Sequence, residues 1–137
     1  MQKSTLFSHI PSDELRLLVA CCQNEVNKEE STLILETFSG VNLQHLIPLA
    51  GKHGILPLLY KTLKNLSEKD LFTDVKTLKL IKEHYLSIAH RNMLMTSELF
   101  RIMSVLADHG IEALAFKGPT LAYLAYGDIT LRQFGDL

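Results

Sequence analysis

The chain has 137 residues, of which 47% are hydrophobic and 21% charged, and its formal net charge is −1 at pH 7. A chain of this length and composition can bury the core of one globular domain without disulfides, and it is not an extended disordered protein. The balanced charge, with no Lys/Arg run longer than a pair, excludes a broad nucleic-acid or anionic-membrane surface.

The first predicted element is a helix over about residues 12–23. Ser12 is a capping residue, two acidic residues follow it, and apolar residues then recur at helical spacing. The neighbouring Cys21 and Cys22 point to different faces of this helix, so we expect two reduced thiols rather than a disulfide. In the next stretch, residues 24–39, the polar residues 27–30 are expected to be solvated, and residues 33–35 fit either a short helix or part of a buried loop.

The following elements are also helices. Asn42 caps a helix that ends near Gly54, although Pro48 should kink this helix or shift its start. Pro57 lies in the first turn of the next helix, whose leucines face inward. Residues 74–109 place apolar side chains at helical spacing without an internal Gly or Pro, which predicts one long helix or two nearly continuous ones.

Two of these helices are expected to end in the same way, at the His-Gly-Ile sequences of residues 53–55 and 109–111. In each, we expect the glycine to end the helix in the left-handed backbone conformation and the isoleucine side chain to pack over the last turn. The histidine faces the negative end of the helix dipole, so we expect a structural role for both histidines. The histidines and cysteines of the chain show no His-x-x-x-His or Cys-x-x-Cys metal-binding spacing.

After Gly110 the period of the apolar residues changes. Residues 111–116 form a short apolar run of the length of a buried strand. Pro119 then begins a helix that continues to about Tyr126, and Gly127 ends it in a loop.

This order of elements predicts a mainly α fold that leads into an incomplete α/β (α+β) core. The helical bundle covers residues 1–110, and the core covers residues 111–137, where the chain stops early in a second strand. An incomplete sheet would expose a strand edge, through which we expect self-association. No run approaches the roughly 18 apolar residues of a membrane span, and no signal peptide is recognisable, so we expect a cytoplasmic protein without a membrane partner.

Lys117 and Gly118 form a turn between the expected strand and the expected helix. The free N–H groups and the positive end of a helix favour a phosphate at such a turn. Gly118 lets the backbone approach a ligand closely, and Lys117 adds a positive charge. The same Lys-Gly-Pro sequence is also found in ordinary turns, so both interpretations stay open.

Asp136 and Arg132 are the other candidate residues. Mg²⁺ in proteins is commonly held by one or two carboxylates together with water and substrate phosphates, so Asp136 fits either a metal ligand or a solvated acid. Arg132 can pair with a phosphate or with Asp136 itself.

From Lys117 to Leu137 the pattern K-G-x-x-L-A-x-x-x-Y-G-D-x-x-x-R-x-x-G-D-L resembles the uncharacterised nucleotidyltransferase family of the polymerase-β-like superfamily. The preceding helices, with the His-Gly-Ile sequences and Arg91-Asn92, are similar to the N-terminal part of those proteins. The resemblance implies that a nucleoside monophosphate is transferred from an NTP to an unknown acceptor with the help of Mg²⁺. It also implies that residues 111–137 begin a nucleotidyltransferase core.

The resemblance further implies a role for each candidate residue. Gly118 lies in the glycine turn that holds the triphosphate, with Pro119 where many superfamily members have Ser, and Lys117 flanks that turn. Arg132 approaches the catalytic strand, and Asp136 is the first acid of an Asp-x-Asp metal motif. The second acid would be residue 138, and one carboxylate cannot hold two metal ions, so we expect the chain as given to be truncated and inactive. The alternative is a non-catalytic helical interaction module or remnant.

Overall fold

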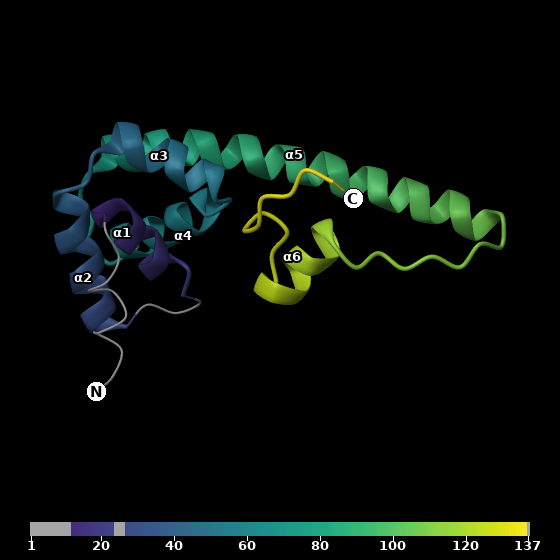
Figure 1. Ribbon diagram of the computed structural model, residues 1–137, viewed down its shortest axis with the longest axis horizontal. Coiled ribbons are helices and arrows are strands. Elements are labelled where there is room, and N and C mark those ends of the chain that lie inside the picture. The colour runs from purple at the N-terminus through teal and green to yellow at the C-terminus, as the bar shows by residue number, and fades with distance from the viewer. Residues whose placement is uncertain (1–11, 24–26, 137) are drawn as a thin grey trace.

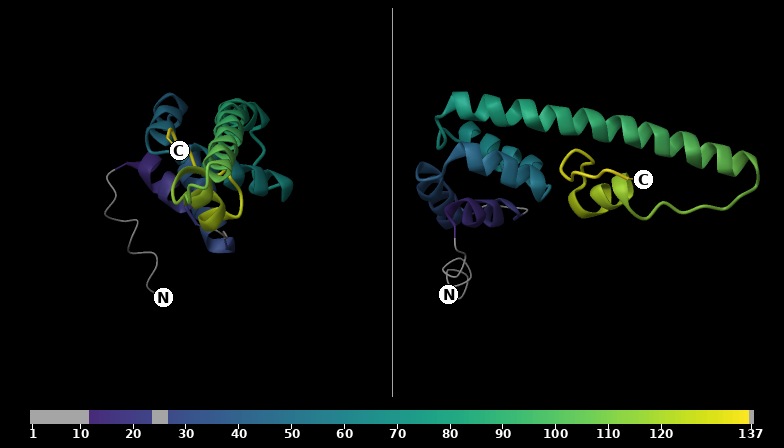
Figure 2. Two further views of the ribbon diagram at one scale, coloured as in Figure 1. Left: turned by 90° about the vertical axis from the view of Figure 1, so that its right-hand side faces the viewer. Right: turned by 45° about the horizontal axis from the view of Figure 1, so that its top comes forward.

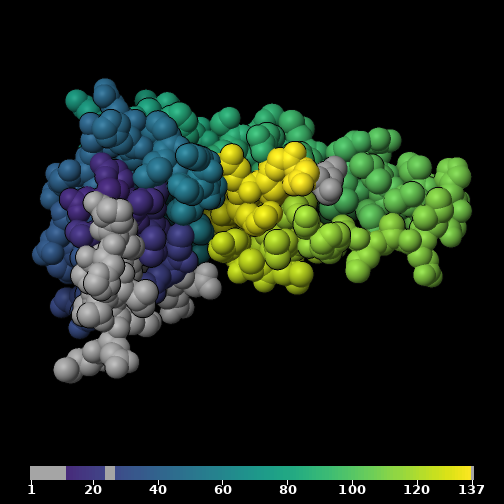
Figure 3. Space-filling model, in the orientation of Figure 1, coloured from purple at the N-terminus to yellow at the C-terminus, as the bar shows by residue number. Residues whose placement is uncertain are grey.

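The computed structural model describes residues 12–23 and 27–136, and all regular secondary structure in these ranges is α-helical. In chain order the helices are α1 (Asp13–Cys21), α2 (Lys28–Ser39), α3 (Leu43–Lys52), α4 (Leu56–Glu68), α5 (Val75–Asp108) and α6 (Gly118–Tyr126). α1 to α4 gather around the first half of α5, while its second half extends away from them (Figure 1). The molecule is therefore elongated, with the bundle at its wide end (Figure 3).

Local capping chemistry sets the starts of the first helices. The Ser12 Oγ accepts a hydrogen bond from the Leu15 N–H at 3.2 Å, as the predicted start of α1 requires. Residues 24–39 were compatible with a helix or a loop, and the described part from Lys28 onwards is helix. Asn27 and Glu30 form a capping box there, in which each side chain accepts from the backbone N–H of the other residue, at 2.9 and 3.0 Å.

The helix α3 begins directly after Asn42, as predicted, and continues through Pro48. The Asn42 side chain accepts a hydrogen bond from the Gln44 N–H at 2.9 Å. The alternative that Pro48 shifts the start of the helix is therefore wrong.

The hydrophobic core lies between α1, α2, α3, α4 and the first half of α5. α4 contributes most of its length to this core, and its Leu59 and Leu63 are fully buried. Pro57 lies in the first turn of the helix, as predicted. Tyr60 of α4 stacks on Tyr85 of α5 with 4.5 Å between the ring centroids. No residue of α5 after Asn92 is buried, so the second half of this helix takes no part in the core.

The thiols of Cys21 and Cys22 are free, as predicted. Cys21 is buried, and burial raises the pKa of its thiol to about 12. Cys22 is exposed, and its thiol donates to the Leu18 carbonyl oxygen at 3.2 Å. The two side chains therefore lie in different environments on α1.

The two His-Gly-Ile helix ends have the predicted backbone conformation. Gly54 and Gly110 have φ of 69° and 68°, and the N–H of the following isoleucine bonds back across the last turn at 2.9 Å in both. The His109 ring nitrogen Nδ1 lies 2.8 Å from the Val105 carbonyl oxygen, as expected of a structural histidine at a helix end. Ile111 itself is exposed and does not close over the last turn of α5.

The predicted strand over residues 111–116 is wrong. These residues have no regular secondary structure, and the described ranges contain no strand, so the expected α/β (α+β) core is replaced there by an all-helical arrangement. A strand requires a neighbouring strand to exchange backbone hydrogen bonds, whereas these residues run beside a helix, which satisfies its own backbone groups. The division into domains at residue 110 stays a prediction. None of the helices in the described ranges is long and apolar enough to cross a membrane.

Candidate functional site

Two segments without regular structure carry the predicted site residues. The connecting segment (residues 111–117) runs back from the far end of α5, and the C-terminal segment (residues 127–136) follows α6 and lies beside the middle of α5. Figure 2 shows the connecting segment returning along α5 toward the bundle, and the C-terminal segment running from α6 back along the same helix. Both segments therefore lie beside α5.

The turn into α6 depends on its glycine. Lys117 is the N-cap residue in an extended conformation, with φ −115° and ψ −162°, and no side chain caps the helix. Gly118 is buried and has a φ of 53°, a left-handed conformation that is costly for any residue with a Cβ. Residue 118 therefore favours glycine for its backbone conformation, whereas its predicted close approach to a ligand stays a prediction, and α6 ends at Gly127 as predicted.

Lys117 and Asp136 line one groove of about 430 Å³ between α5 and the connecting segment. The groove is otherwise mostly apolar, with Leu99, Met103 and Phe116 among its walls. Both Lys117 and Asp136 are exposed, and among the described residues no ion pair within 4.0 Å joins them. The structure therefore brings these two predicted site residues to the same groove with their charges available to a ligand.

The Lys117 ammonium also has an aromatic neighbour. Its Nζ atom lies 5.6 Å from the centroid of the Phe116 ring, which is within the range of a cation–π contact. Gly118 and Arg132 do not line the groove. Arg132 is half-buried, and its backbone carbonyl, rather than its guanidinium, makes the hydrogen bond recorded for it.

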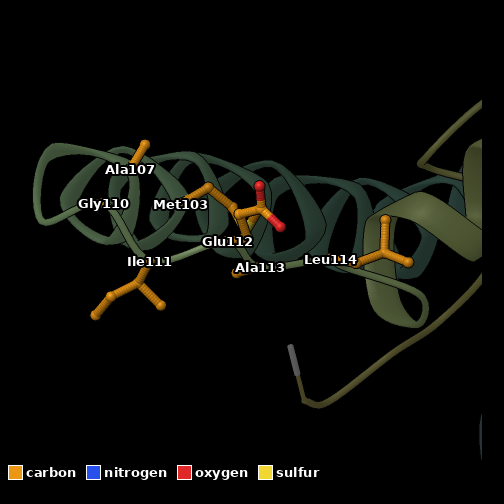
Figure 4. Close-up of a pocket in the computed structure, with 7 residues that line it drawn as sticks. All are labelled: Met103, Ala107, Gly110, Ile111, Glu112, Ala113 and Leu114. Carbon is orange, nitrogen blue, oxygen red and sulfur yellow. The ribbon is translucent and has the colours of Figure 1, made fainter.

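A wider hollow of about 850 Å³ lies farther along α5, where that helix turns into the connecting segment. Figure 4 shows its seven lining residues, of which Glu112 alone carries a charge. None of the predicted site residues lines this hollow.

Hydrogen bonds from α5 fix the C-terminal segment. The Asn92 Nδ2 donates to the carbonyl oxygens of Ile129 and Arg132, both at 2.8 Å, and the Arg91 guanidinium donates to the Phe134 carbonyl oxygen. Tyr85 Oη and Thr130 Oγ1 lie 2.9 Å apart. These contacts join parts of the chain that are far apart in sequence, and local patterns did not predict them.

A turn within the C-terminal segment is closed by Asp128. Its carboxylate Oδ1 accepts hydrogen bonds from the N–H of Thr130 at 2.8 Å and from its hydroxyl at 2.7 Å. Asp128 is thus a turn residue. In the ranges that the structure describes, His, Cys, Asp and Glu form no group of three or more that could hold a metal ion.

A family model described as uncharacterised nucleotidyltransferase matches residues 39–137. The match begins at the last residue of α2 and includes α3 to α6, so it extends well beyond the motif at the end of the chain. No curated protein and no solved structure matches significantly. The family match includes the groove and the α5 residues that hold the C-terminal segment.

Proposed function

The chain belongs to the family of uncharacterised nucleotidyltransferases, and we propose that its groove receives an NTP from which a nucleoside monophosphate is transferred to an acceptor. The observation that supports this proposal is the meeting of Lys117 and Asp136 in one groove, at the N-terminal end of α6. A cation, a carboxylate and free helix N–H groups are the chemistry that a metal-bound triphosphate requires.

The Lys117–Gly118 turn would bind the phosphates. α6 has no side-chain cap among the described residues, and we propose that the N–H groups of Gly118 and Thr120 bind phosphate oxygens, since Pro119 has none. Gly118 is buried, so it would hold the turn in place, while Lys117 supplies a positive charge from the wall of the groove. We propose that Arg132 meets the nucleotide from outside this groove, since it does not line it.

Asp136 would hold the divalent metal, for which we propose Mg²⁺. One exposed carboxylate without a cluster of further ligands in the described residues fits a metal that arrives with the nucleotide and takes its other ligands from phosphate and water. When bound, Mg²⁺ would neutralise phosphate charge and polarise the α-phosphate for attack by an acceptor hydroxyl. Asp136 itself would orient the metal-bound nucleotide toward Lys117.

Nucleotide binding by calorimetry tests the proposal directly. We expect Lys117→Ala to weaken Mg·ATP binding about tenfold or more, because it removes a charged contact to phosphate. Asp136→Asn should instead remove the dependence of binding on Mg²⁺. Lys52→Ala and Asp108→Ala, at exposed positions near the ends of α3 and α5, are matched controls that should bind like the wild type. Unchanged binding in both groove variants would refute the assignment.

The exposed apolar side chains favour a second function, that of a non-catalytic interaction module. Leu114, Phe116 and Leu124 are 87%, 70% and 76% exposed. Such a surface is typical of a face that meets another protein, and self-association stays a prediction for it. A folded chain that binds no NTP with Mg²⁺ or Mn²⁺, and that sediments as a dimer, would support this function over the first.

A further inference from the structure

We propose that Arg91 and Asn92 of α5 are positioning residues for the groove, because they hold the C-terminal segment so that Asp136 lines the same groove as Lys117. This inference rests on the proposed function of the groove. It assigns a role to a pair of neighbouring residues in the middle of a long helix, where neither would touch the nucleotide.

Asn92 acts as a clamp on the turn that carries Arg132. It is fully buried, and its two amide hydrogens go to the carbonyl oxygens at the two ends of residues 129–132. The Asn92 Oδ1 has no partner in the structure. A flipped amide would place that oxygen against two carbonyl oxygens, so the donating orientation is the one that fits.

Arg91 acts closer to Asp136. Its guanidinium donates to the carbonyl oxygen of Phe134, two residues before Asp136. Asp136 is two residues from the Phe134 contact, a span of at most about 7 Å, and four residues from the Asn92 contact at Arg132, a span of at most about 14 Å. The hydrogen bond from Arg91 is therefore the nearer of these two contacts to Asp136.

The Phe134 side chain is itself buried at 4% exposure. The C-terminal segment should therefore keep its packing when Arg91 is lost. What Arg91 fixes is the direction in which the chain leaves Phe134 toward the groove, so its replacement should alter the site without unfolding the bundle.

The test combines amide hydrogen exchange with a double-mutant cycle on the full chain. We expect Asn92→Asp, which loses two hydrogen bonds to carbonyl oxygens, to speed exchange in residues 129–136 roughly tenfold, and Arg91→Ala, which loses one, to speed it similarly only in the residues after Phe134. Arg101→Ala is the control, because Arg101 lies on the exposed far half of the same helix and, among the described residues, forms an ion pair with Glu98 alone. Its exchange should match that of the wild type.

The cycle separates positioning from direct binding. If Arg91 acts through Asp136, Arg91→Ala should weaken Mg·ATP binding, and the double variant with Asp136→Asn should bind within about twofold of Asp136→Asn alone. Additive losses would mean that Arg91 contacts the nucleotide itself, and unchanged exchange would mean that it does not hold the segment. Either result overturns the inference. A wild-type chain that binds no Mg·ATP overturns the proposed function instead, which keeps the two failures distinct.

Discussion

The replacement of Gly118 by alanine probes the turn at the start of α6. Gly118 has a φ of 53°, so the added Cβ should cost about 1–2 kcal/mol in the folded state. The same replacement lowers the conformational entropy of the unfolded chain, which offsets about 0.4–1 kcal/mol of the folded-state cost. We therefore expect Gly118→Ala to lower the free energy of unfolding by about 1 kcal/mol and also to weaken nucleotide binding.

Gly51→Ala is the matched control for this experiment. Gly51 lies inside α3, its φ is not positive, and an added Cβ meets nothing within 4 Å. The same change of residue should therefore raise the free energy of unfolding by about 0.5–1 kcal/mol through helix propensity. Because the two variants change the unfolded chain alike, their difference reports the folded state.

Urea denaturation followed by circular dichroism measures both variants. For a slope of about 2 kcal/mol/M, the midpoint should fall by about 0.5 M in Gly118→Ala and rise by a smaller amount in Gly51→Ala. Amide exchange in α6 then shows whether the loss is local to that helix. Equal midpoints for the two variants would refute the argument that the turn requires a left-handed residue.

Three further predictions concern the rest of the fold. The Asp74 carboxylate accepts hydrogen bonds from the Thr77 hydroxyl and N–H, which lower its pKa, so the stability that it contributes is full above about pH 4 and is lost as pH falls through the folded-state pKa. Asp74→Ala should lower the free energy of unfolding by about 1 kcal/mol at pH 7. Asp74→Asn should keep the helix cap and lose less stability in acid, as thermal melts between pH 2 and 7 would show. A disulfide-exchange reagent at pH 8 should label Cys22 in the folded protein and Cys21 only after denaturation, and rapid labelling of both would contradict the burial of Cys21. Leu63→Ala, at a fully buried position, should cost about 2–5 kcal/mol in the same urea assay, whereas Leu124→Ala at 76% exposure should stay within about 0.5 kcal/mol of the wild type.

The helix boundaries could be predicted because their causes are local. Ser12, Asn42, Gly54 and Gly127 each act on the backbone within one turn of their own position, and the structure shows them at the starts and ends of helices. The start of α2 has an equally local cause, since Asn27 and the acid three residues later form a capping box.

The strand prediction failed because a short apolar run does not indicate whether a second strand lies beside it. Residues 111–116 are apolar enough for a strand, but pairing depends on a second strand that the described residues do not contain. For the candidate site, the local turn at Gly118 was predictable from glycine chemistry. The contacts of Arg91 and Asn92 were not, because each joins α5 to a segment about 40 residues later.

The way in which α5 joins the bundle to the C-terminal segment has a consequence for how the sequence can change in length. Ile81 of this helix is fully buried in the core, and Asn92 is fully buried against the C-terminal segment. One residue inserted between them would rotate Asn92 by about 100° relative to Ile81 and turn its amide away from both carbonyl oxygens. An insertion or deletion of one residue between Ile81 and Asn92 should therefore not be tolerated.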